Sequence, residues 1–523
     1  MKELVYWGIG KIGRQCIEYF SENVPTFIID SNCPETEYNG IPIYRPEAVK
    51  NWNSLYIVIT VLDSALIKQL LRQKNLEENV DFEDYKDFLG IQDEKADENI
   101  IRLENIVKKN KGLSNRILIF APVFIARQTD ILQNFLHQYA MHRNCVLISL
   151  WDVMSEEMAS EKLGFPAFKM AEIAGWSSFD EQDLKNEELE ITDLSDEDQK
   201  WIADLMYRKA RHDNSDSLKY LQQQYQYLKS VIKIFQPKNM IIWGGWAYNS
   251  YIFGHLCKVY CIPCCYMEYG WIPGTYQFDP DGIAGQSVCA NVPNPETDFN
   301  SSKINAIKDY IISKKTDSLL FKYNLEDEKK IVAIDHKKKT VFLVGMGDFQ
   351  MRINSESDYW KKYVSSVVFS TEDAFEYIKN ICAKHNWNFI FKPHPGFKTE
   401  SSRIFNESSV YIFRDMQIDR LIESSDVVVS ISSAVNYKVL LYNKPLVQIG
   451  VTCLSGKDCC YETDSKNHIE EMIVKALENG MTGQQNYNFN KHLDMLLSNY
   501  LWDDLSEKEI GYGLTFEKDF PFK

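Results

Sequence analysis

Short apolar runs, separated by longer stretches of helical periodicity, dominate the pattern of this chain. Runs such as Tyr56–Val61, Arg116–Pro122 and Thr340–Val344 are apolar almost throughout, as expected for strands buried on both faces of a parallel sheet. Polar or glycine-containing turns follow these runs, and stretches with apolar residues at helical spacing lie between them. This alternation predicts an α/β protein in which helices cover parallel sheets.

The first unit begins with a β-α-β pattern and ends near residue 92. A strand at Leu4–Trp7 leads into a glycine motif, a helix is expected at Arg14–Ser21, and a second strand ends at Asp30. Three glycines at this spacing permit a tight turn beside a pyrophosphate, and an acid about 20 residues further on can bind a ribose. The unit is short for a complete dinucleotide-binding domain, so a scaffold or docking role stands beside a nucleotide site. The candidate nucleotide-binding residues are Gly8, Gly10, Gly13 and Asp30.

The same pattern divides the rest of the chain into two larger α/β units and a tail. A second unit contains a helix at Thr129–Met141 and a strand that ends at Glu268, and a third begins after a lysine-rich turn. The tail is helical, with leucines able to pack back on the body. The predicted boundaries are 1–92 for the small Rossmann-like domain, 93–115 for a linker helix, 116–336 and 337–465 for the two larger domains, and 466–523 for the tail.

Composition and charge indicate a globular protein of several domains and argue against nucleic acid as a partner. The chain has 523 residues, of which 45% are hydrophobic and 25% charged, so several ordinary globular domains are expected. A formal net charge of −16 argues against nucleic acid as a partner. The N-terminus does not resemble a signal peptide, and no apolar run approaches the roughly 20 residues of a spanning helix. We expect a cytoplasmic protein, with peripheral contact to the inner membrane face or to an assembly complex left open.

The cysteines do not indicate a metal centre. Most of the 12 cysteines should be reduced in a cytosolic chain. Cys261, Cys264 and Cys265 resemble half of a zinc site, but Cys459 and Cys460 are a poor second half because the second C-x-x-C spacing is missing. We therefore expect no bound metal.

Two loops in the third unit carry the chemistry expected of a phosphate site. One follows the strand Phe389–Phe391 and the other follows Val427–Ser430 and opens a helix. In an open α/β sheet such loops face one crevice at the carboxyl ends of the strands. Lysine, histidine and serine side chains beside a helix N-terminus are what a phosphate needs. The candidate nucleotide-sugar ligands are Lys392, His394, Pro395, Ser432, Ser433 and Gln350.

Carboxylates in the second unit could perform acid–base chemistry. Glu268 ends a strand and is followed by glycines, which leave it uncovered; Asp279 and Asp281 lie in the turn-rich stretch beyond it. Such a group could remove the proton of an acceptor hydroxyl or act as a nucleophile. Asp279 and Asp281 could equally cap the local backbone. Their spacing is that of a metal-binding Asp-x-Asp pair, but they lie on the acceptor side, which favours a metal-independent reaction.

Two open α/β units with a helical tail are the layout of a GT-B glycosyltransferase. The chain resembles the capsule polysaccharide biosynthesis family, which includes bacterial β-Kdo transferases that use CMP-Kdo. The resemblance covers about residues 240–450. It rests on Glu268 to Gly274, Asp279 to Gly282 with Ser287, His394-Pro395, and Ser432-Ser433. The chain is also similar to bacterial sialyltransferases of GT-B form, although Glu268-Tyr269-Gly270 departs from their acidic motif.

The resemblance implies a metal-independent transferase that needs no cofactor. Its donor would be a CMP-activated Kdo or related ulosonic acid, and its acceptor a glycan or lipid-linked glycan of a bacterial surface polysaccharide. Glu268 would be the base or acid/base, supported by Asp279 or Asp281, one of which could instead be the nucleophile. His394 and Ser432 or Ser433 would hold the CMP phosphate, and Lys392 the negative charge.

Three alternatives remain at this level. An NAD-dependent oxidoreductase would centre on Gly8, Gly10 and Gly13. A non-catalytic assembly protein could retain a degenerate glycosyltransferase fold. A CDP-polyol phosphotransferase also combines a GT-B fold with histidine motifs.

Overall fold

The computed structural model describes most of the chain. The described residues are 2–31, 33, 35–61, 64–90, 94–121, 144–149, 155–171, 194–209, 215–245, 247–272, 275–296, 299–313, 325–348, 353–394 and 410–503. The helix predicted at Thr129–Met141 lies outside them. The chain divides into two compact units, Met1–Arg102 with Val123–Gly175 and Leu103–Pro122 with Trp176–Lys523.

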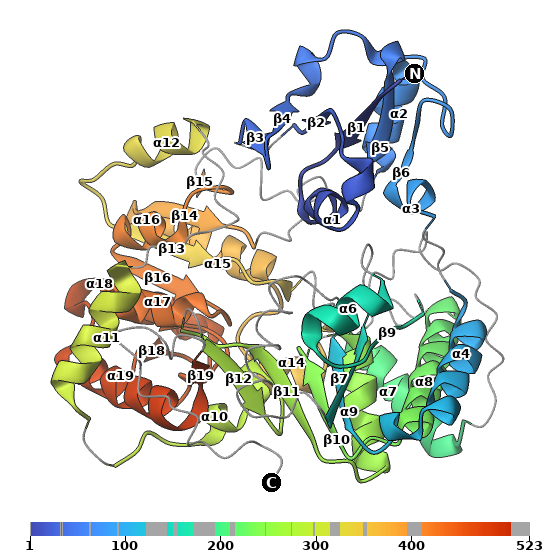
Figure 1. Cartoon of the computed structure of the whole chain (residues 1–523). Helices are drawn as coiled ribbons and strands as arrows, with labels where there is room; N and C mark the ends of the chain where they lie inside the picture. Colours follow the sequence, from blue (N-terminus) through green and yellow to red (C-terminus); the bar gives the residue numbers. More distant parts are fainter. Residues whose placement is uncertain are drawn as a thin grey trace. The chain divides into compact units, whose positions relative to one another are not determined.

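A six-stranded sheet forms the start of the first unit (Figure 1). The strand order is β3-β4-β2-β1-β5-β6, and all neighbours are parallel except β3 and β4. This sheet confirms the predicted β-α-β pattern. Its strands are β1 (Glu3–Trp7), β2 (Phe27–Ile29), β3 (Glu37–Tyr38), β4 (Ile41–Tyr44), β5 (Leu55–Ile59) and β6 (Phe82–Asp84); its helices are α1 (Lys11–Tyr19), α2 (Ala65–Gln73) and α3 (Tyr85–Phe88).

Helix α1 begins earlier than the Arg14 start predicted from the glycine motif. Gly13 lies inside the helix, and a Cβ atom at this position would be 2.0 Å from the carbonyl oxygen of Gly8. Gly8 itself has a φ of +115°, which side chains rarely adopt. The glycines therefore let the first turn of the helix pack directly on the preceding loop.

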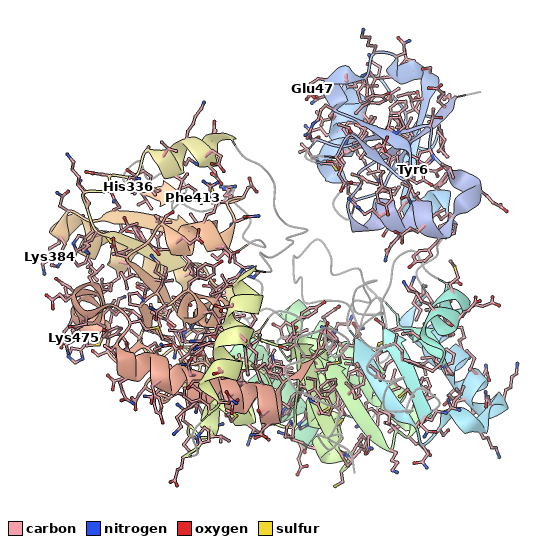
Figure 2. All side chains as sticks on the ribbon, turned by 60° about the vertical axis from the view of Figure 1, so that its left-hand side comes forward. Tyr6, Glu47, His336, Lys384, Phe413 and Lys475 are labelled. Carbon is pink, nitrogen blue, oxygen red and sulfur yellow. The ribbon has the colours of Figure 1, made fainter. Side chains whose placement is uncertain are left out.

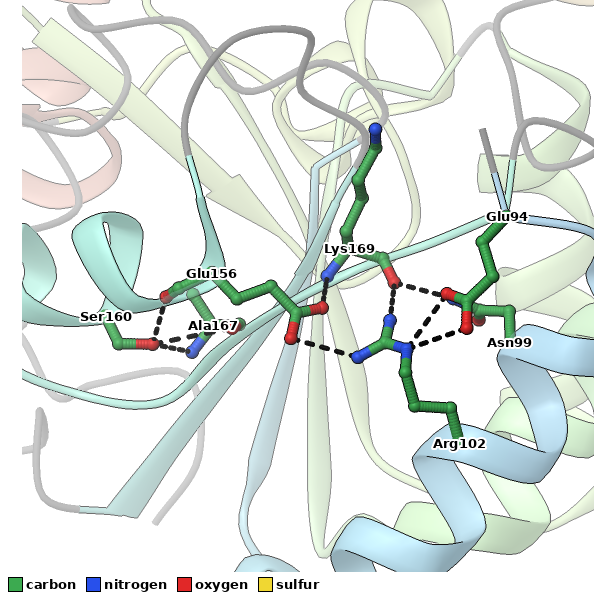
Figure 3. Close-up of polar contacts among 7 residues, drawn as sticks. All are labelled: Glu94, Asn99, Arg102, Glu156, Ser160, Ala167 and Lys169. Atoms are coloured by element: carbon green, nitrogen blue, oxygen red, sulfur yellow. Dashed lines mark hydrogen bonds and ion pairs between the residues drawn. The ribbon is translucent and has the colours of Figure 1, made fainter. Parts of the chain in front are cut away.

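An ionic cluster organises the second part of the first unit (Figure 3). Arg102, from α4 (Ala96–Lys109), donates to Glu94 at 2.9 Å and to Glu156 at 2.9 Å. Its Nη2 also donates to the carbonyl oxygen of Lys169 at 3.2 Å, and Asn99 Nδ2 donates to the same oxygen at 3.0 Å. The cluster ties α4 to α6 (Glu156–Leu163) and β9 (Ala167–Lys169), which pairs with β8 (Cys145–Ser149).

We predict that Arg102→Met loosens this part of the first unit. Glu94 and Glu156 are 29% and 30% exposed, so removing the guanidinium leaves two half-buried carboxylates without their partner. The local free energy of opening should fall by about 2 kcal/mol. Amide hydrogen exchange in α6 and β9, measured by mass spectrometry, should accelerate by roughly thirtyfold.

Lys108→Met is the matched control, because the Lys108–Glu104 pair is solvent-exposed, with the two side chains 69% and 48% accessible. It should change exchange little, since exposed pairs on one helix contribute only about 0.3–0.5 kcal/mol. Equal exchange rates in the two variants would show that the Arg102 cluster does not hold these elements together.

The second unit contains a sheet whose strands follow the order β19-β12-β11-β10-β7. Strands β7, β10 and β11 are parallel, whereas β12 runs antiparallel to both β11 and β19. Its strands are β7 (Ile117–Ala121), β10 (Asn239–Trp243), β11 (Cys264–Tyr269), β12 (Thr275–Asp279) and β19 (Trp502–Asp503); its helices include α7 (Asp196–Lys209), α8 (Ser215–Phe235), α9 (Tyr248–Val259) and α10 (Val288–Asn291).

Strand β12 differs from the sequence-based expectation of a turn-rich loop. The segment pairs along its length with β11, with Glu268 opposite Gln277 and Tyr266 opposite Asp279. Every residue of β12 is buried. The prediction failed because the strand is framed by glycines and aspartates that are typical of turns, while its β-forming Thr, Tyr and Phe were not weighed.

The other sheet of the second unit has six strands, all parallel, in the order β15-β14-β13-β16-β17-β18. Its strands are β13 (Thr340–Val344), β14 (Asn388–Lys392), β15 (Tyr411–Ile412), β16 (Val427–Ser430), β17 (Leu446–Gln448) and β18 (Tyr461–Glu462). The associated helices are α11 (Ser301–Ser313), α12 (Leu325–Val332), α14 (Asp358–Tyr363), α15 (Thr371–His385), α16 (Ile418–Glu423), α17 (Val435–Leu441), α18 (Ile469–Asn479) and α19 (Gly483–Met495). The α/β class, with Rossmann-type sheets after a small Rossmann-like sheet, is thus confirmed.

The described part of the tail, residues 466–503, packs on this sheet. Leu493, Leu497 and Leu501 are buried in one core cluster with Phe342 of β13 and Ile390 of β14. Phe413 is fully buried, whereas Lys384 and Lys475 project from surface helices (Figure 2). None of the helices in the described residues combines the length and apolar character needed to cross a membrane.

Candidate functional site

The parallel sheet aligns the ends of four strands in one row. Val344 of β13 is in register with Lys392 of β14 and with Ser430 of β16, and Ser430 is in register with Gln448 of β17. Because these strands are parallel, the loops that follow them emerge at the same edge. The structure therefore brings the Lys392–His394 segment and the Ser430–Ser433 segment to one edge of one sheet.

Two glycines let the loop after β13 lie against the His394 loop. The amide of Gly345 donates to the carbonyl oxygen of Lys392 at 2.8 Å. A Cβ atom on Gly345 would lie 2.8–2.9 Å from backbone atoms of Lys392, Pro393 and His394, and one on Gly347 would lie 3.4 Å from the His394 ring. The imidazole therefore lies over a glycine, where a larger residue would press on it. The sequence shows a Gly-Met-Gly motif after a buried strand at this point, but the motif by itself does not predict the contact with His394.

Burial favours the uncharged forms of the two basic groups in this loop. It lowers the pKa of the half-buried His394, and the nearby charge of Asp348 opposes this only partly. Burial likewise lowers the pKa of Lys392, against the raising effects of Asp327 and Asp415. The Nζ of Lys392 donates to the carbonyl oxygen of Arg414 at 2.6 Å. A neutral imidazole can donate one hydrogen bond and accept another, and an added phosphate would favour protonation.

Asp348 supports the neighbouring helix. Its Oδ2 accepts from the amide of Thr371 at 2.8 Å and its Oδ1 from the Thr371 hydroxyl at 2.9 Å. Asp348 is 4% exposed, and Thr371 begins α15. The carboxylate therefore links the loop after β13 to the start of α15, and its charge reaches His394.

The serine segment combines accessible hydroxyls with buried polar atoms. Ser432 and Ser433 are partly exposed, and the Ser433 Oγ accepts from the amide of Val435 at 3.2 Å. Beneath them, Ser430 Oγ and Asn436 Oδ1 are buried and have no hydrogen-bond partner among the described residues. The other end of the Asn436 amide donates to Gln448 Oε1 at 3.2 Å. Unpaired buried polar atoms are costly, so these two atoms at the serine segment call for a partner such as a ligand or a water molecule.

Glu268 lies at the carboxyl edge of the other sheet in this unit. Its Oε2 would be 3.5 Å from a Cβ atom on Gly244, the residue that follows β10, and its Oε1 accepts from the amide of Tyr269 at 2.9 Å. The side chain keeps part of its surface accessible although protein surrounds most of it. Burial raises its pKa to about 7, with the Tyr269 hydrogen bond acting in the opposite sense. A carboxyl group with such a pKa can give and take a proton near neutral pH.

Asp279 and Asp281 differ sharply in their surroundings. Asp279 is fully buried and accepts four hydrogen bonds, which come from the amides of Asp281, Gly282 and Val288 and from the Tyr500 hydroxyl. Burial raises its pKa, and these donors oppose the rise. Asp281 is exposed. Asp279 therefore holds the surrounding loop through its hydrogen bonds, while Asp281 faces solvent.

An aromatic stack joins the Glu268 segment to the serine segment. The Trp271 ring stacks on Tyr437 of α17, with 5.4 Å between ring centres, and on Tyr500 of the tail, with 5.6 Å; in both pairs the ring planes are nearly parallel, at 10° and 5°. Tyr500 in turn donates to Asp279 at 2.7 Å. No pattern in the sequence places these three aromatic residues in the site, because their proximity depends on three segments far apart in the chain. A second contact, Ser287 Oγ to Cys453 Sγ at 2.9 Å, joins the same two sheets.

The N-terminal glycine motif belongs to the first unit. Asp30 Oδ2 accepts from the amide of Ile9 at 3.0 Å, and its Oδ1 accepts from the amide of Cys33 at 2.7 Å. A Cβ atom on Gly10 would meet nothing within 4 Å. Asp30, which the sequence suggests as a ribose ligand, thus holds the glycine loop in place.

Two of the predicted ligands, Gln350 and Pro395, lie outside the described residues. Within the described ranges, no three His, Cys, Asp or Glu side chains gather closely enough to hold a metal ion. The cysteines there are all free thiols, and Cys257, Cys265, Cys453 and Cys459 are buried.

Comparisons with known proteins give distant likenesses of fold. No family model and no curated sequence matches the chain. It is similar to KpsC of Thermosulfurimonas dismutans, a β-Kdo 2,4 transferase, with 12% identity over 50% of this chain and 80% of that one, and a TM-score of 0.32. It is also similar to MnaA of S. aureus solved with UDP (10% identity, 72% and 91% covered, TM-score 0.32). A third is the glycosyltransferase SnogD of Streptomyces nogalater (10%, 73% and 95%, TM-score 0.29). These likenesses are too distant to carry an activity to this chain.

We predict that Gly345→Ala displaces the His394 loop. The added methyl group would be 2.8–2.9 Å from three backbone atoms that cannot rotate away. Overpacking of this kind costs about 1–3 kcal/mol, so the stability of the protein should fall by about 2 kcal/mol in chemical denaturation. The His394 signal in a spectrum of ¹³C-labelled histidine should move at the same time.

Gly483→Ala tests whether this effect is specific. Gly483 begins α19, and a Cβ atom there meets nothing within 4 Å, so stability should stay the same or rise slightly. If Gly345→Ala left both the stability and the His394 signal unchanged, the close approach of the two loops would be refuted.

Proposed function

We propose that this protein is a metal-independent glycosyltransferase that transfers a sugar from a nucleotide donor to a glycan or lipid-linked acceptor. One observation carries the proposal. The carboxyl edge of a parallel sheet gathers Lys392, His394 and Ser432 with Ser433, and a stack through Trp271 links this edge to the strand end that bears Glu268. A phosphate-binding edge beside a carboxyl group with a pKa of about 7 supplies both halves of a group transfer.

The donor we propose is a CMP-activated Kdo or related ulosonic acid, and the pathway is bacterial surface polysaccharide synthesis. This choice rests on the motifs Glu268-Tyr269-Gly270, His394-Pro395 and Ser432-Ser433, which resemble those of capsule polysaccharide enzymes. His394 and the serine hydroxyls would hold the phosphate through hydrogen bonds. Lys392 would have to leave the Arg414 carbonyl oxygen, or reach past it, to neutralise the donor.

In the proposed reaction, the acceptor hydroxyl gives its proton to Glu268 as its oxygen bonds to the anomeric carbon of the donor sugar. The bond between that carbon and the phosphate oxygen breaks, and its electron pair leaves with the nucleotide. Hydrogen bonds from His394 and Ser432 or Ser433 stabilise the departing phosphate. We assign a supporting role to Asp279, because all its hydrogen bonds hold the loop and Tyr500. Asp281, which is exposed, is the remaining candidate for direct contact.

We further propose that the N-terminal glycine domain is accessory. The two oxygens of Asp30 accept from the backbone amides of Ile9 and Cys33, so a role in holding the glycine loop accounts for this acid without a bound ribose or an NAD-dependent oxidoreductase. The enzyme would work in the cytoplasm, where its donor is made, and would meet lipid-linked acceptors at the inner membrane face.

We expect His394→Ala to weaken nucleotide binding. Loss of one hydrogen bond to a charged phosphate costs about 1.5–3 kcal/mol, so the dissociation constant should rise by at least about tenfold. Isothermal titration with CMP, CDP, UDP, GDP and NAD measures it, and CMP should bind most tightly to the native protein. His336→Ala is the control, because His336 is exposed and lies before β13, at the amino edge of the sheet. Equal CMP affinity in both variants would remove His394 from the donor site.

We expect Glu268→Gln to abolish turnover while leaving nucleotide affinity within twofold of the native value. Removing a general base reduces the rate by about 100-fold or more. A base must be ionised to act, so the native rate should fall as pH drops below about 7, the pKa to which burial raises Glu268. CMP release from a CMP-activated ulosonic acid reports the rate. Glu423→Gln, on an exposed residue at the end of α16, is the control. A glutamine variant as fast as the native enzyme would exclude Glu268 as the base.

A further inference from the structure

A cavity of about 440 Å³ opens at the carboxyl edge of the all-parallel sheet, beyond the serine segment. Ile449, Gly450 and Val451, which follow β17, line it together with Glu462 at the end of β18. Helix α18 adds Met472, and β18 and α18 lie side by side at the outer end of this sheet (Figure 1). The volume is within the range of about 300–1,000 Å³ that is typical of small-molecule sites.

The cavity adjoins the proposed phosphate edge but uses other residues. The amide of Ile449 donates to the carbonyl oxygen of Ser430 at 2.9 Å. A Cβ atom on Gly450 would be 2.4 Å from the carbonyl oxygen of Ile431. Ser455, another lining residue, accepts from Gln448 at 2.9 Å, and Gln448 accepts from Asn436 of α17. The cavity is therefore anchored to the strand and helix that present Ser432 and Ser433.

The lining is acidic and hydroxylic rather than basic. Glu462 and Asp464 contribute carboxyl groups, Thr463 a hydroxyl and His468 an imidazole. None of the described residues that line the cavity is lysine or arginine. Phosphate or a sugar acid would be repelled by the two carboxylates and would find no cation to neutralise it. The cavity is thus unsuited to the charged part of the donor.

Glu462 is set up to accept hydrogen bonds from neutral hydroxyls. The amide of Gly456 donates to both of its oxygens at 3.1 Å, which fixes the carboxyl group and leaves further lone pairs on each oxygen. Burial raises the pKa of this carboxyl group above its ordinary value. Val367, Val451 and Met472 supply apolar surface for the carbon faces of a ring.

We propose that this cavity binds the uncharged, polyhydroxylated ring of a sugar, with Glu462 accepting hydrogen bonds from its hydroxyls. The ring could belong to a nucleotide sugar or to the acceptor glycan of the proposed transferase, and only this question of source rests on the proposed function. The cavity adds a specificity-determining subsite outside the phosphate-binding segments.

Saturation-transfer NMR on the full chain tests the proposal. The probes are methyl glycosides of glucose, galactose, mannose and N-acetylglucosamine, with inorganic phosphate and Mg²⁺ as charged competitors. At least one glycoside should bind, and Glu462→Gln should weaken it by about tenfold, as expected when a hydrogen bond to a charged group is lost. Glutamine keeps an acceptor for the Gly456 amide, so the variant should fold. Glu423→Gln, whose site lies at the amino edge of the same sheet, should bind as the native protein does.

Asp464→Lys is a second variant, and it should not disturb folding because Asp464 is exposed. It should reduce glycoside binding and allow inorganic phosphate to compete. The proposal is overturned if no glycoside binds, if binding is insensitive to Glu462→Gln, or if phosphate or Mg²⁺ displaces the glycoside from the native protein.

Adding UDP-glucose or UDP-N-acetylglucosamine identifies the source of the ring. Displacement of the glycoside by one of these, but not by the free nucleotide, would assign the cavity to the donor sugar. Simultaneous binding would assign it to the acceptor. Nucleotide binding without glycoside binding would reject this inference alone, whereas glycoside binding without any nucleotide binding would reject the proposed transferase alone.

Discussion

Parallel hydrogen bonding between β13 and its neighbours β14 and β16 is the constraint on which the candidate site depends. A parallel ladder aligns successive strands in one direction, so Val344, Lys392 and Ser430 end in one row. The loops that follow must then share an edge, however far apart they lie in the chain. The loop after β13 also lies close to the His394 loop. Gly345 makes this possible, because a side chain at that position would collide with the backbone of His394.

The second half of the site depends on packing rather than on pairing. Trp271 stacks on rings from α17 and from the tail, and Tyr500 continues this contact to the buried carboxylate of Asp279. Stacked rings hold the loop after Glu268 against the helix after Ser433 with little freedom to slide. The stacked aromatic rings thus connect the segment that bears Glu268 to the helix that follows Ser432 and Ser433. The neighbouring acidic cavity extends the same edge with a different chemistry.

Much of the fold could be predicted from the sequence because buried parallel strands have a strong local signature. The runs at Thr340–Val344 and Val427–Ser430 are strands in the structure, and Leu493, Leu497 and Leu501 of the tail are buried. Strand β12 was missed because its flanking residues are typical of turns. Its burial comes from pairing with β11 and β19, and β19 lies more than two hundred residues away in the chain. The aromatic stack could not be predicted either, because no local pattern indicates a contact among segments as distant as those of Trp271, Tyr437 and Tyr500.

The sequence by itself determined the α/β class, the positions of most strands, and the placement of His394 and the serine segment at one edge of a sheet, because strand periodicity and strand-end loops are local properties. Only the tertiary structure decided which carboxyl groups are available. Burial raises the pKa of both Glu268 and Asp279, but Glu268 keeps part of its surface accessible, whereas Asp279, equally prominent in the sequence, is fully buried and enclosed by four donors. The physical reason is that burial and hydrogen-bond partners are set by residues brought together in space, and these set the proton affinity of each group.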